Sequence, residues 1–312
     1  MENNTIVLGS RGSQLALWQT EFVRGLLEAY APQYAYRIEV VHTKGDKIRD
    51  VALSKIGGKG LFTKELEVEL LDGRVDLCVH STKDMPTELP EGLVLSGMPL
   101  RADPRDALVS PVAGLTLDTL PQGARVATGS LRRVAQLKRL RPDIETCEMR
   151  GNIDTRTRRV MDGEFDAAIL AASGLTRLGM TDRIASYLPT DVMIPAAGQG
   201  AIAIETRADD EVVNALCAAI SDEVTLRCVA AERVVLGALE GGCQVPMGIH
   251  ADEYERDGVT VFGIDAFVSS LDGQRFLRAS AEGDPAASTE LARAVVSDLR
   301  AQGAEEILEE LR

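Results

Sequence analysis

The 312-residue sequence predicts an α/β protein built from more than one domain. Its length exceeds the size at which a single hydrophobic core usually stops growing. Short apolar runs of strand length alternate with segments of helical periodicity, a pattern typical of parallel-rich sheets covered by helices. This alternation restarts after residue 100, and a shorter tail follows residue 220. We therefore expect two α/β domains that face a cleft and a small third α/β domain.

The first domain begins with an apolar run that ends at Arg11, and Ser13 is placed to cap the helix that follows. The apolar face of this helix is expected at Leu17, Phe22 and Leu26. The expected strands are 6–10, 36–42, 75–80 and 92–98, with a second helix at 63–71. The loop 43–60 holds four glycines and five basic residues, so it is either a lid or a disordered segment.

The second domain and the tail continue the same alternation. Strands are expected at 124–127, just before Met149, at 165–171 and at 201–205, with helices after Ser130, from Asp154, at 209–220 and at 223–237. A connector rich in proline and glycine spans 194–200. The tail is expected to hold two strands near 248–252 and 259–268, a turn at 272–273, and helices at 288–299 and 305–311.

The charge of the chain is unevenly distributed. Its net charge is −14, yet the segment from Arg125 to Val160 holds ten basic and four acidic residues. A basic segment in an acidic protein indicates a site for an anionic ligand. Nucleic acid is a poor candidate for that ligand, because aromatic residues make up only 4% of the chain and none lies among these arginines.

The sequence favours a cytoplasmic protein. The five cysteines are widely spaced and form no C-x-x-C pair, which favours reduced thiols over disulfides or a zinc site. Only three histidines are present, so we expect no metal site. The N-terminus has no basic-then-apolar leader, and no apolar run is long enough to cross a bilayer, so we expect no membrane partner.

One cysteine lies in an unusual setting. Cys243 stands between a glycine pair and a Val-Pro step in the loop 239–248, which is too rich in turn residues for a helix or a central strand. Such a loop can hold the thiol outward, within reach of a ligand. The alternative is a small apolar residue in a loop, because free cysteines are often buried.

A candidate anion site begins at the strand-to-helix junction Thr128-Gly129-Ser130. Backbone N–H groups and the helix dipole favour an anion at such a junction, and Arg132 and Arg133 follow within the first turn. With Arg150 and Arg156 near the next helix, these side chains suit a ligand with several carboxylates. Alternatively, Ser130 is only a helix cap.

A second candidate site follows the strand 75–80. Lys83 and Asp84 lie just past its carboxyl end, where α/β folds bind ligands. A carboxylate there can stabilise a developing cation or transfer a proton, although a local ion pair that closes a turn is the alternative. Within this strand, His80 is expected to be a buried imidazole with a hydrogen-bond partner, and Cys78 a core residue.

Taken together, these stretches resemble the porphobilinogen deaminase family, also called hydroxymethylbilane synthases. The matching motifs are Ser10-Arg11, LALWQ at 15–19, KIGGKGLFTKE at 55–65, HSTKDMP at 80–86, DPRDA at 103–107, GSLRR at 129–133, RGNIDTR at 150–156, PAAGQG at 195–200 and LEGGCQVP at 239–246. They run in the family's order over nearly the whole chain. Thr82 replaces a more usual apolar residue, at a position that we expect to be tolerant.

The resemblance implies three domains. Residues 1–99 with 200–219 form a discontinuous first domain with the lid loop 43–60, and residues 100–199 form a second domain with the arginine-rich anion site. Both resemble type II periplasmic-binding-protein domains around a cleft. Residues 220–312 form a small C-terminal α/β domain with a short antiparallel sheet and the cysteine loop 239–248.

The resemblance also implies the chemistry. A dipyrromethane cofactor, two linked pyrroles that bear acetate and propionate groups, is attached to Cys243 through a thioether. Four porphobilinogen molecules are added to this primer head to tail with loss of ammonia, and hydrolysis then releases hydroxymethylbilane. Asp84 is implied as the catalytic residue that stabilises the cationic azafulvene and assists both elimination and later deprotonation.

Further roles are carried over residue by residue. The implied cofactor contacts are Ser81, Lys83, Thr128, Gly129, Ser130, Arg132, Arg133, Arg150 and Arg156. The implied substrate contacts are Arg11, Ser13, Gln19, Arg177 and Gln199. Lys55 and Lys59 are placed on the lid. The partners are thus porphobilinogen and the growing pyrrole chain, with no nucleic acid, membrane or metal, and the implied state is a monomer.

Two other functions fit parts of the sequence. A non-catalytic two-lobed protein that binds a small anion uses the same fold, but such proteins need an export signal and leave Cys243 unexplained. A thiol transferase with a transient acyl-cysteine needs a base, and only His250 lies near the motif.

Overall fold

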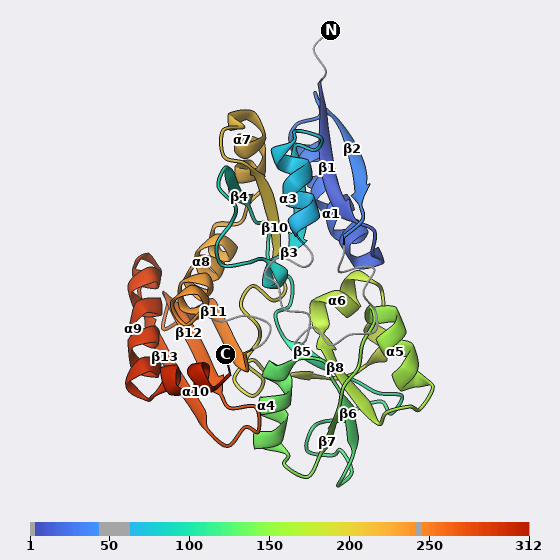
Figure 1. The fold of residues 1–312 in the computed structure, drawn as a ribbon, viewed down its shortest axis with the longest axis vertical. Helices are drawn as coiled ribbons and strands as arrows, with labels where there is room; N and C mark the ends of the chain where they lie inside the picture. The colour runs from blue at the N-terminus through green and yellow to red at the C-terminus, as the bar shows by residue number, and fades with distance from the viewer. Residues whose placement is uncertain (1–3, 44–62, 241–244, 312) are drawn as a thin grey trace. The chain divides into compact units, whose positions relative to one another are not determined.

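The structure is a computed structural model that describes residues 4–43, 63–240 and 245–311. The chain divides into two compact units (Figure 1). In the described ranges, unit 1 holds residues 4–43, 63–102 and 200–226, and unit 2 holds residues 103–199 and 227–311. No described helix is long and apolar enough to span a membrane.

Unit 1 is built on a five-stranded mixed sheet. Its strands are β1 (Thr5–Arg11), β2 (Ala35–Val41), β3 (Leu77–Ser81), β4 (Leu93–Gly97) and β10 (Ile202–Arg207), in the order β2-β1-β3-β10-β4. Strand β1 runs parallel to β2 and β3, whereas β10 runs antiparallel to β3 and β4. Helices α1 (Gln14–Tyr30) and α7 (Glu211–Ala219) cover one face, and α3 (Lys64–Leu71) covers the other.

Helix α1 begins where the sequence predicts, but it buries a different face. The Ser13 side chain accepts a hydrogen bond from the Ala16 backbone N–H, so Ser13 is the helix cap. The buried stripe is Ala16, Thr20, Val23 and Leu27, whose spacing follows the helical repeat. The predicted face was therefore wrong, and one of its members, Phe22, is exposed and stacks on Trp18.

Unit 2 contains a second five-stranded mixed sheet. Its strands are β5 (Asp106–Val109), β6 (Arg125–Ala127), β7 (Glu145–Cys147), β8 (Ala167–Ala171) and β9 (Ile184–Leu188), in the order β7-β6-β8-β5-β9. Strand β6 is parallel to β7 and β8, and β5 is antiparallel to β8 and β9. Helix α4 (Leu131–Leu140) packs on one face, and α5 (Ile153–Met161) and α6 (Ala172–Arg177) pack on the other.

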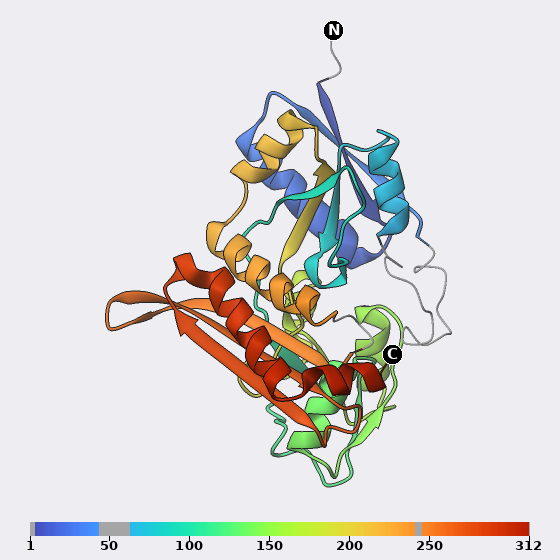
Figure 2. The same cartoon turned by 60° about the vertical axis from the view of Figure 1, so that its left-hand side comes forward.

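The C-terminal part of unit 2 forms a three-stranded antiparallel sheet. It consists of β11 (Met247–Arg256), β12 (Val259–Ser269) and β13 (Phe276–Gly283) in sequential order. Figure 2 shows α8 (Glu223–Ala238), α9 (Ser288–Ala301) and α10 (Ala304–Glu310) packed along this sheet, and one apolar core joins them to it. Three short 3-10 helices, η1 (Thr82–Asp84), η2 (Thr181–Arg183) and η3 (Pro285–Ala287), complete the described elements.

The predicted α/β class with a small antiparallel C-terminal sheet is confirmed, with corrections to the sheets. Both large sheets are mixed instead of parallel-rich, because β10 and β5 run against their neighbours. The tail has three strands where two were expected, and β5, β9 and α6 were not predicted. The boundaries of the three predicted domains stay a prediction.

Candidate active site

A pocket in unit 1 lies at the carboxyl ends of β1 and β3. Because these two strands are adjacent and parallel, the segments that follow them meet at one edge of the sheet. The pocket is lined by Arg11, Ser13, Leu15, Ala16, Gln19, Thr63, Val79, His80, Ser81 and Asp84. The structure thus brings together five residues that the sequence singled out: Arg11, Ser13, Gln19, Ser81 and Asp84.

Local hydrogen bonds hold the polar side chains of this pocket. The buried Gln19 amide nitrogen donates to Ser81 Oγ over 2.9 Å, and Ser81 Oγ lies 3.2 Å from Gln19 Oε1. Asp84 ends the 3-10 helix η1, whose turn closes through a bond from Met85 N–H to the Thr82 carbonyl. Buried Met85 and Thr82 flank an exposed Asp84, so a fixed backbone presents a carboxylate that a ligand can reach.

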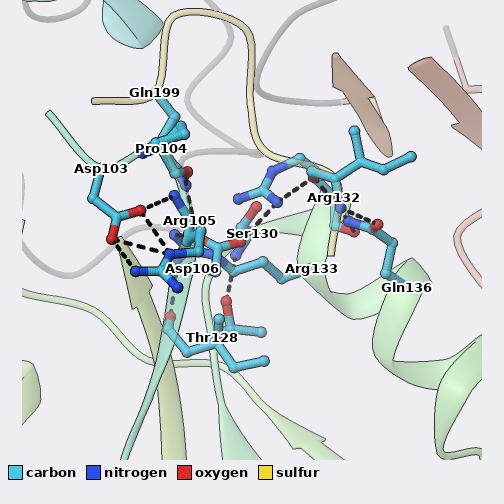
Figure 3. A network of polar contacts seen from close by, with 12 residues as sticks. Asp103, Pro104, Arg105, Asp106, Thr128, Ser130, Arg132, Arg133, Gln136 and Gln199 are labelled. Carbon is cyan, nitrogen blue, oxygen red and sulfur yellow. Dashed lines mark hydrogen bonds and ion pairs between the residues drawn. The ribbon is translucent and has the colours of Figure 1, made fainter. Parts of the chain in front are cut away.

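Unit 2 contains a buried network of two arginines around one aspartate (Figure 3). Arg132 Nη1 donates to Asp106 Oδ2 over 2.8 Å, and Arg133 Nη2 donates to Asp106 Oδ1 over 2.7 Å. Gln199 Nε2 adds a third bond to Oδ1 at 2.9 Å. Asp106 is fully buried, and both guanidinium-bearing side chains are at most 7% exposed.

The electrostatics of this network keep Asp106 ionised. Burial by itself would raise the pKa of Asp106, but the charges of Arg132 and Arg133 and their hydrogen bonds outweigh burial and hold it well below its usual range. The two arginines also donate to backbone carbonyls, Arg132 to Ile194 and Arg133 to Ile169. Much of their donor capacity is therefore used within the protein.

The connector at residues 194–199 ties this network to the C-terminal sheet. Gln136 of α4 bonds both the N–H and the carbonyl of Ile194. At the other end, the buried Glu232 of α8 accepts from Gly198 N–H at 2.6 Å and from Ala251 N–H at 2.8 Å. The arginine pair is thus fixed relative to α8 and β11, the elements on either side of the cysteine loop.

The junction at Thr128-Gly129-Ser130 is shaped for a close approach of backbone. A Cβ at Gly129 would lie 3.0 Å from the Met149 carbonyl oxygen, so a larger residue would crowd this turn. Ser130 occupies the cap position of α4, but its side chain makes no capping hydrogen bond. The buried Thr128 accepts instead, from the Ser130 N–H at 3.3 Å. The Ser130 hydroxyl is therefore not used as the cap that was the alternative explanation.

The other predicted arginines of unit 2 lie at helix ends. Half-buried Arg156 follows the Asn152 cap of α5 and donates to the Gly151 carbonyl at 2.7 Å. Half-buried Arg150 lies 3.3 Å from Glu148 Oε1. Arg177 is the last residue of α6, where burial lowers its pKa to about 10.

Three predicted positions lie outside the described residues: Cys243, Lys55 and Lys59. Lys83, half-buried in η1, is described. Within the described ranges, no cluster of three or more His, Cys, Asp or Glu side chains suits a metal ion.

Sequence reasoning missed two polar centres. Asp106 was noted only as part of a motif, although an acid that opens the apolar run Ala-Leu-Val is a signal of a paired buried charge. The second is Glu205. His80 is a buried imidazole with a hydrogen-bond partner, as expected, and its partner is Glu205: the Nε2 and Oε2 atoms lie 3.0 Å apart in the interior of unit 1. For Glu205, its position among apolar strand residues was the available signal.

Comparison with known proteins gives matches over almost the whole chain. A family model described as "Porphobilinogen deaminase, dipyromethane cofactor binding domain" matches residues 6–215, and "Porphobilinogen deaminase, C-terminal domain" matches residues 226–301. A porphobilinogen deaminase of Syntrophobacter fumaroxidans is 49% identical over 311 residues, covering 100% of this chain and 99% of the relative. One of Brevibacillus brevis is 49% identical over 305 residues, covering 97% and 96%. Among solved structures, the methionine-binding protein MetQ is 14% identical, with a TM-score of 0.46 over 74% of this chain and 96% of that chain.

Proposed function

Because this chain belongs to the porphobilinogen deaminase family, we propose that Asp84 is its catalytic carboxylate and that Cys243 anchors its dipyrromethane cofactor. The reaction is the stepwise condensation of four porphobilinogen molecules with loss of ammonia, followed by hydrolytic release of hydroxymethylbilane. The family match over residues 6–215 is to a cofactor-binding domain, which favours a transferase over a non-catalytic anion-binding protein. The observation that carries the site assignment is the pocket that collects Asp84 with Arg11 and Gln19.

Asp84 is suited to stabilise positive charge. When ammonia leaves porphobilinogen, the remaining pyrrole carries a cation, and an ionised carboxylate held at the pocket wall lowers the energy of that state. The exposed carboxylate of Asp84 on the rigid turn of η1 needs little reorganisation to do so. In the same pocket, Arg11 supplies a cation for a substrate carboxylate, and the Gln19–Ser81 hydrogen bond fixes the wall between them.

The donor set in unit 2 fits a ligand with several carboxylates. Half-buried Arg150 and Arg156 and the hydroxyl of Ser130 lie at the starts of helices, where N–H groups also favour anions. When bound, the cofactor supplies a nucleophilic pyrrole carbon. Arg132 and Arg133 would hold its carboxylates only through the nitrogens that remain after their bonds to Asp106 and to backbone carbonyls.

The remaining assignments follow from the resemblance to the family. Ser13 is committed to the cap of α1, so its hydroxyl would contact substrate only through its second lone pair. Gln199 would act by holding Asp106, and Arg177, Lys83, Thr128, Gly129, Lys55 and Lys59 keep the roles that the resemblance implies. We also propose a cytoplasmic monomer. The thiols of Cys78, Cys147 and Cys217, which form no disulfide, support a reducing compartment.

The first experiment is the intact mass of the purified protein, with peptide mapping. We expect an addition of the size of a dipyrromethane on the peptide that contains Cys243, and no addition in Cys243→Ser. The matched control is Cys147→Ser, at a half-buried free thiol, which should remain fully loaded. A wild-type protein that stays unmodified after incubation with porphobilinogen would refute the anchor assignment.

The second experiment concerns Asp84→Asn. An amide cannot offset the substrate cation, so kcat should fall by about 100- to 1,000-fold while the primer remains attached. Near-normal turnover in a loaded Asp84→Asn enzyme would exclude Asp84 as the stabilising carboxylate.

A further inference from the structure

Behind the pocket of unit 1 lies a buried cluster of ionisable side chains that the proposed mechanism leaves unused. His80 lies on β3 and Glu205 on β10, and His80 Nε2 is 3.0 Å from Glu205 Oε2, with the two side chains 3% and 0% exposed. Glu67 of α3 is buried beside them. Two carboxyl groups and one imidazole thus share an interior space.

The sheet register explains how these groups meet. In the antiparallel pair of β3 and β10, Ala203 lies opposite His80 and Glu205 lies opposite Cys78. Because side chains alternate along a strand, His80, Cys78 and Glu205 leave the sheet on the same face. That face is covered by α3, which packs on β3 and β10 and carries Glu67 (Figure 1).

Two carboxylate oxygens of this cluster lack a hydrogen-bond partner among the described residues. In the described part of the chain, Glu205 Oε1 and Glu67 Oε1 have no hydrogen-bond partner. Burial raises the pKa of Glu67, and the negative charge of Glu205 adds to the rise, whereas His80 opposes it. Each carboxyl group thus has one buried oxygen without a hydrogen-bond partner, beside the imidazole of His80.

His80 connects this cluster to the pocket. It lines the same pocket as Asp84 and Arg11. The charged and titratable groups near it are Glu205 from β10, Glu67 from α3, Cys78 from β3, Arg11 from β1 and Asp84 from η1, and the charge of Lys64 acts on Glu67. Burial raises the pKa of Cys78 well above its usual value, so its thiol stays neutral. When Glu205 accepts from Nε2–H, Nδ1 is the nitrogen left to take up a proton.

Each condensation step of the proposed reaction needs a group on the protein that accepts a proton. The C–N bond of the aminomethyl group of porphobilinogen breaks, and its electron pair leaves with ammonia. The primer, when bound, would supply the carbon nucleophile for the new C–C bond, and the proton released from that carbon would need an acceptor on the protein. Asp84 must remain ionised while the cation exists, whereas the acceptor must gain a proton. Both requirements are met when two groups in different environments take one role each: one group stays ionised and the other accepts the proton.

We propose that His80, held by Glu205 and buried beside Glu67, takes the place of Asp84 in the later deprotonation and accepts the proton that is lost from carbon in each condensation. This inference rests on the proposed deaminase function. The proton then passes to the departing ammonia or to water, so the cluster returns to its starting state and the overall product is ammonium. His80 acts in the pocket, and Glu205 and Glu67 are positioning residues that set its proton affinity.

The test is the dependence of kcat on pH between 5 and 9 for primer-loaded enzymes. His80→Asn should lower kcat by about 100-fold, which is at the lower end of the loss expected when a general base is removed. It should also remove the part of the kcat–pH curve in which kcat changes because the proton acceptor titrates. Glu67→Gln and Glu205→Gln keep the side-chain shape and should shift that part of the curve. The matched control is Cys78→Ala, opposite Glu205 on the same face, which removes packing but no titrating proton and should leave the profile unchanged.

The outcomes separate this inference from the proposed function. Loading is verified by intact mass in every variant. A wild-type enzyme that never carries the cofactor refutes the proposed function itself. A loaded wild-type enzyme whose profile keeps the same shape in Glu67→Gln and Glu205→Gln refutes only the proton-accepting cluster, even where His80→Asn fails to fold. Shifts in both glutamine variants without a shift in Cys78→Ala would support it.

Discussion

Replacing Asp106 by asparagine tests whether the arginine pair is a structural unit. The carboxylate of Asp106 is the common acceptor for Arg132, Arg133 and Gln199, at 2.8, 2.7 and 2.9 Å. Asparagine preserves the size of the side chain but removes the negative charge. It also turns one acceptor into an NH2 group that points at a guanidinium or at the Gln199 amide.

The expected loss follows from burial. Breaking a buried ion pair by removing one partner typically costs about 3–5 kcal/mol, because the other charge stays buried without compensation. Here two guanidinium groups lose the same partner, and both side chains are nearly inaccessible to water. Because domains are typically stable by only ~5–15 kcal/mol, we expect Asp106→Asn to lose a large part of the stability of unit 2.

Urea unfolding of wild type and variant measures this loss, with Asp103→Asn as the matched control. Asp103 pairs bidentately with Arg105 in the same segment, but both side chains are partly exposed, at 29% and 43%. Exposed pairs contribute only about 0–1 kcal/mol, so the control should unfold close to wild type.

The pH dependence gives an independent check. The folded pKa of Asp106 is lowered from its ordinary value of 3.8, so its contribution is fully present above that value and is lost as pH falls through the folded pKa. Wild type and Asp106→Asn should therefore converge in stability in acid and differ most near neutral pH. If Asp106→Asn costs no more stability than Asp103→Asn at pH 7, the carboxylate of Asp106 does not hold the two arginines in place.

Four further predictions concern single positions. Gly248→Ala should lower the free energy of unfolding by about 1–3 kcal/mol, since the added Cβ would lie 2.7 Å from the Ile194 carbonyl oxygen. Gly25→Ala, in open space on α1, should raise the free energy of unfolding by about 0.5–1 kcal/mol. Urea unfolding curves of the two variants and the wild type test both predictions. Asn152→Ala removes the cap bond to Thr155 N–H and should cost about 1 kcal/mol, and an unchanged urea midpoint would refute the cap. The folded pKa of Glu67 is raised above its ordinary 4.5, so its contribution falls as pH rises from that value through the folded pKa; Glu67→Gln should flatten the fall in urea midpoint over this window, and an equal slope would contradict it.

The sequence predicted the start of a helix well where a capping residue marks it. Ser13 marked the start of α1 because its hydroxyl has a specific backbone partner, Ala16 N–H. The buried face of α1 was not predicted, because Ala16 and Thr20 are small or polar and carry little apolar signal, whereas Phe22 is large and lies exposed. Helix position depends on local bonds, but helix orientation depends on the surface against which the helix packs.

For the strands and the site, too, features set by local sequence were predictable, whereas features set by distant residues were not. Strand β5 is only four residues long and begins with Asp106. A charged first residue argues against a buried strand, and only the structure shows that Arg132 and Arg133 lie beside this carboxylate and pair with it. The meeting of Arg11 and Asp84 in one pocket was predictable from strand ends in an α/β fold. The pairing of His80 with Glu205 joins residues 125 positions apart, and no local pattern encodes it.

The place of β10 in the sheet of unit 1 has a consequence for synthesis on the ribosome. Strand β10 lies between β3 and β4, yet its residues 202–207 come more than 100 residues after β4. Until they emerge, β3 and β4 lack their shared neighbour and expose unpaired edges that favour association with other chains. The five-stranded sheet of unit 2 spans only residues 106–188. A chain made from its N-terminus therefore completes its second large sheet before its first, because β3 and β4 must wait for β10.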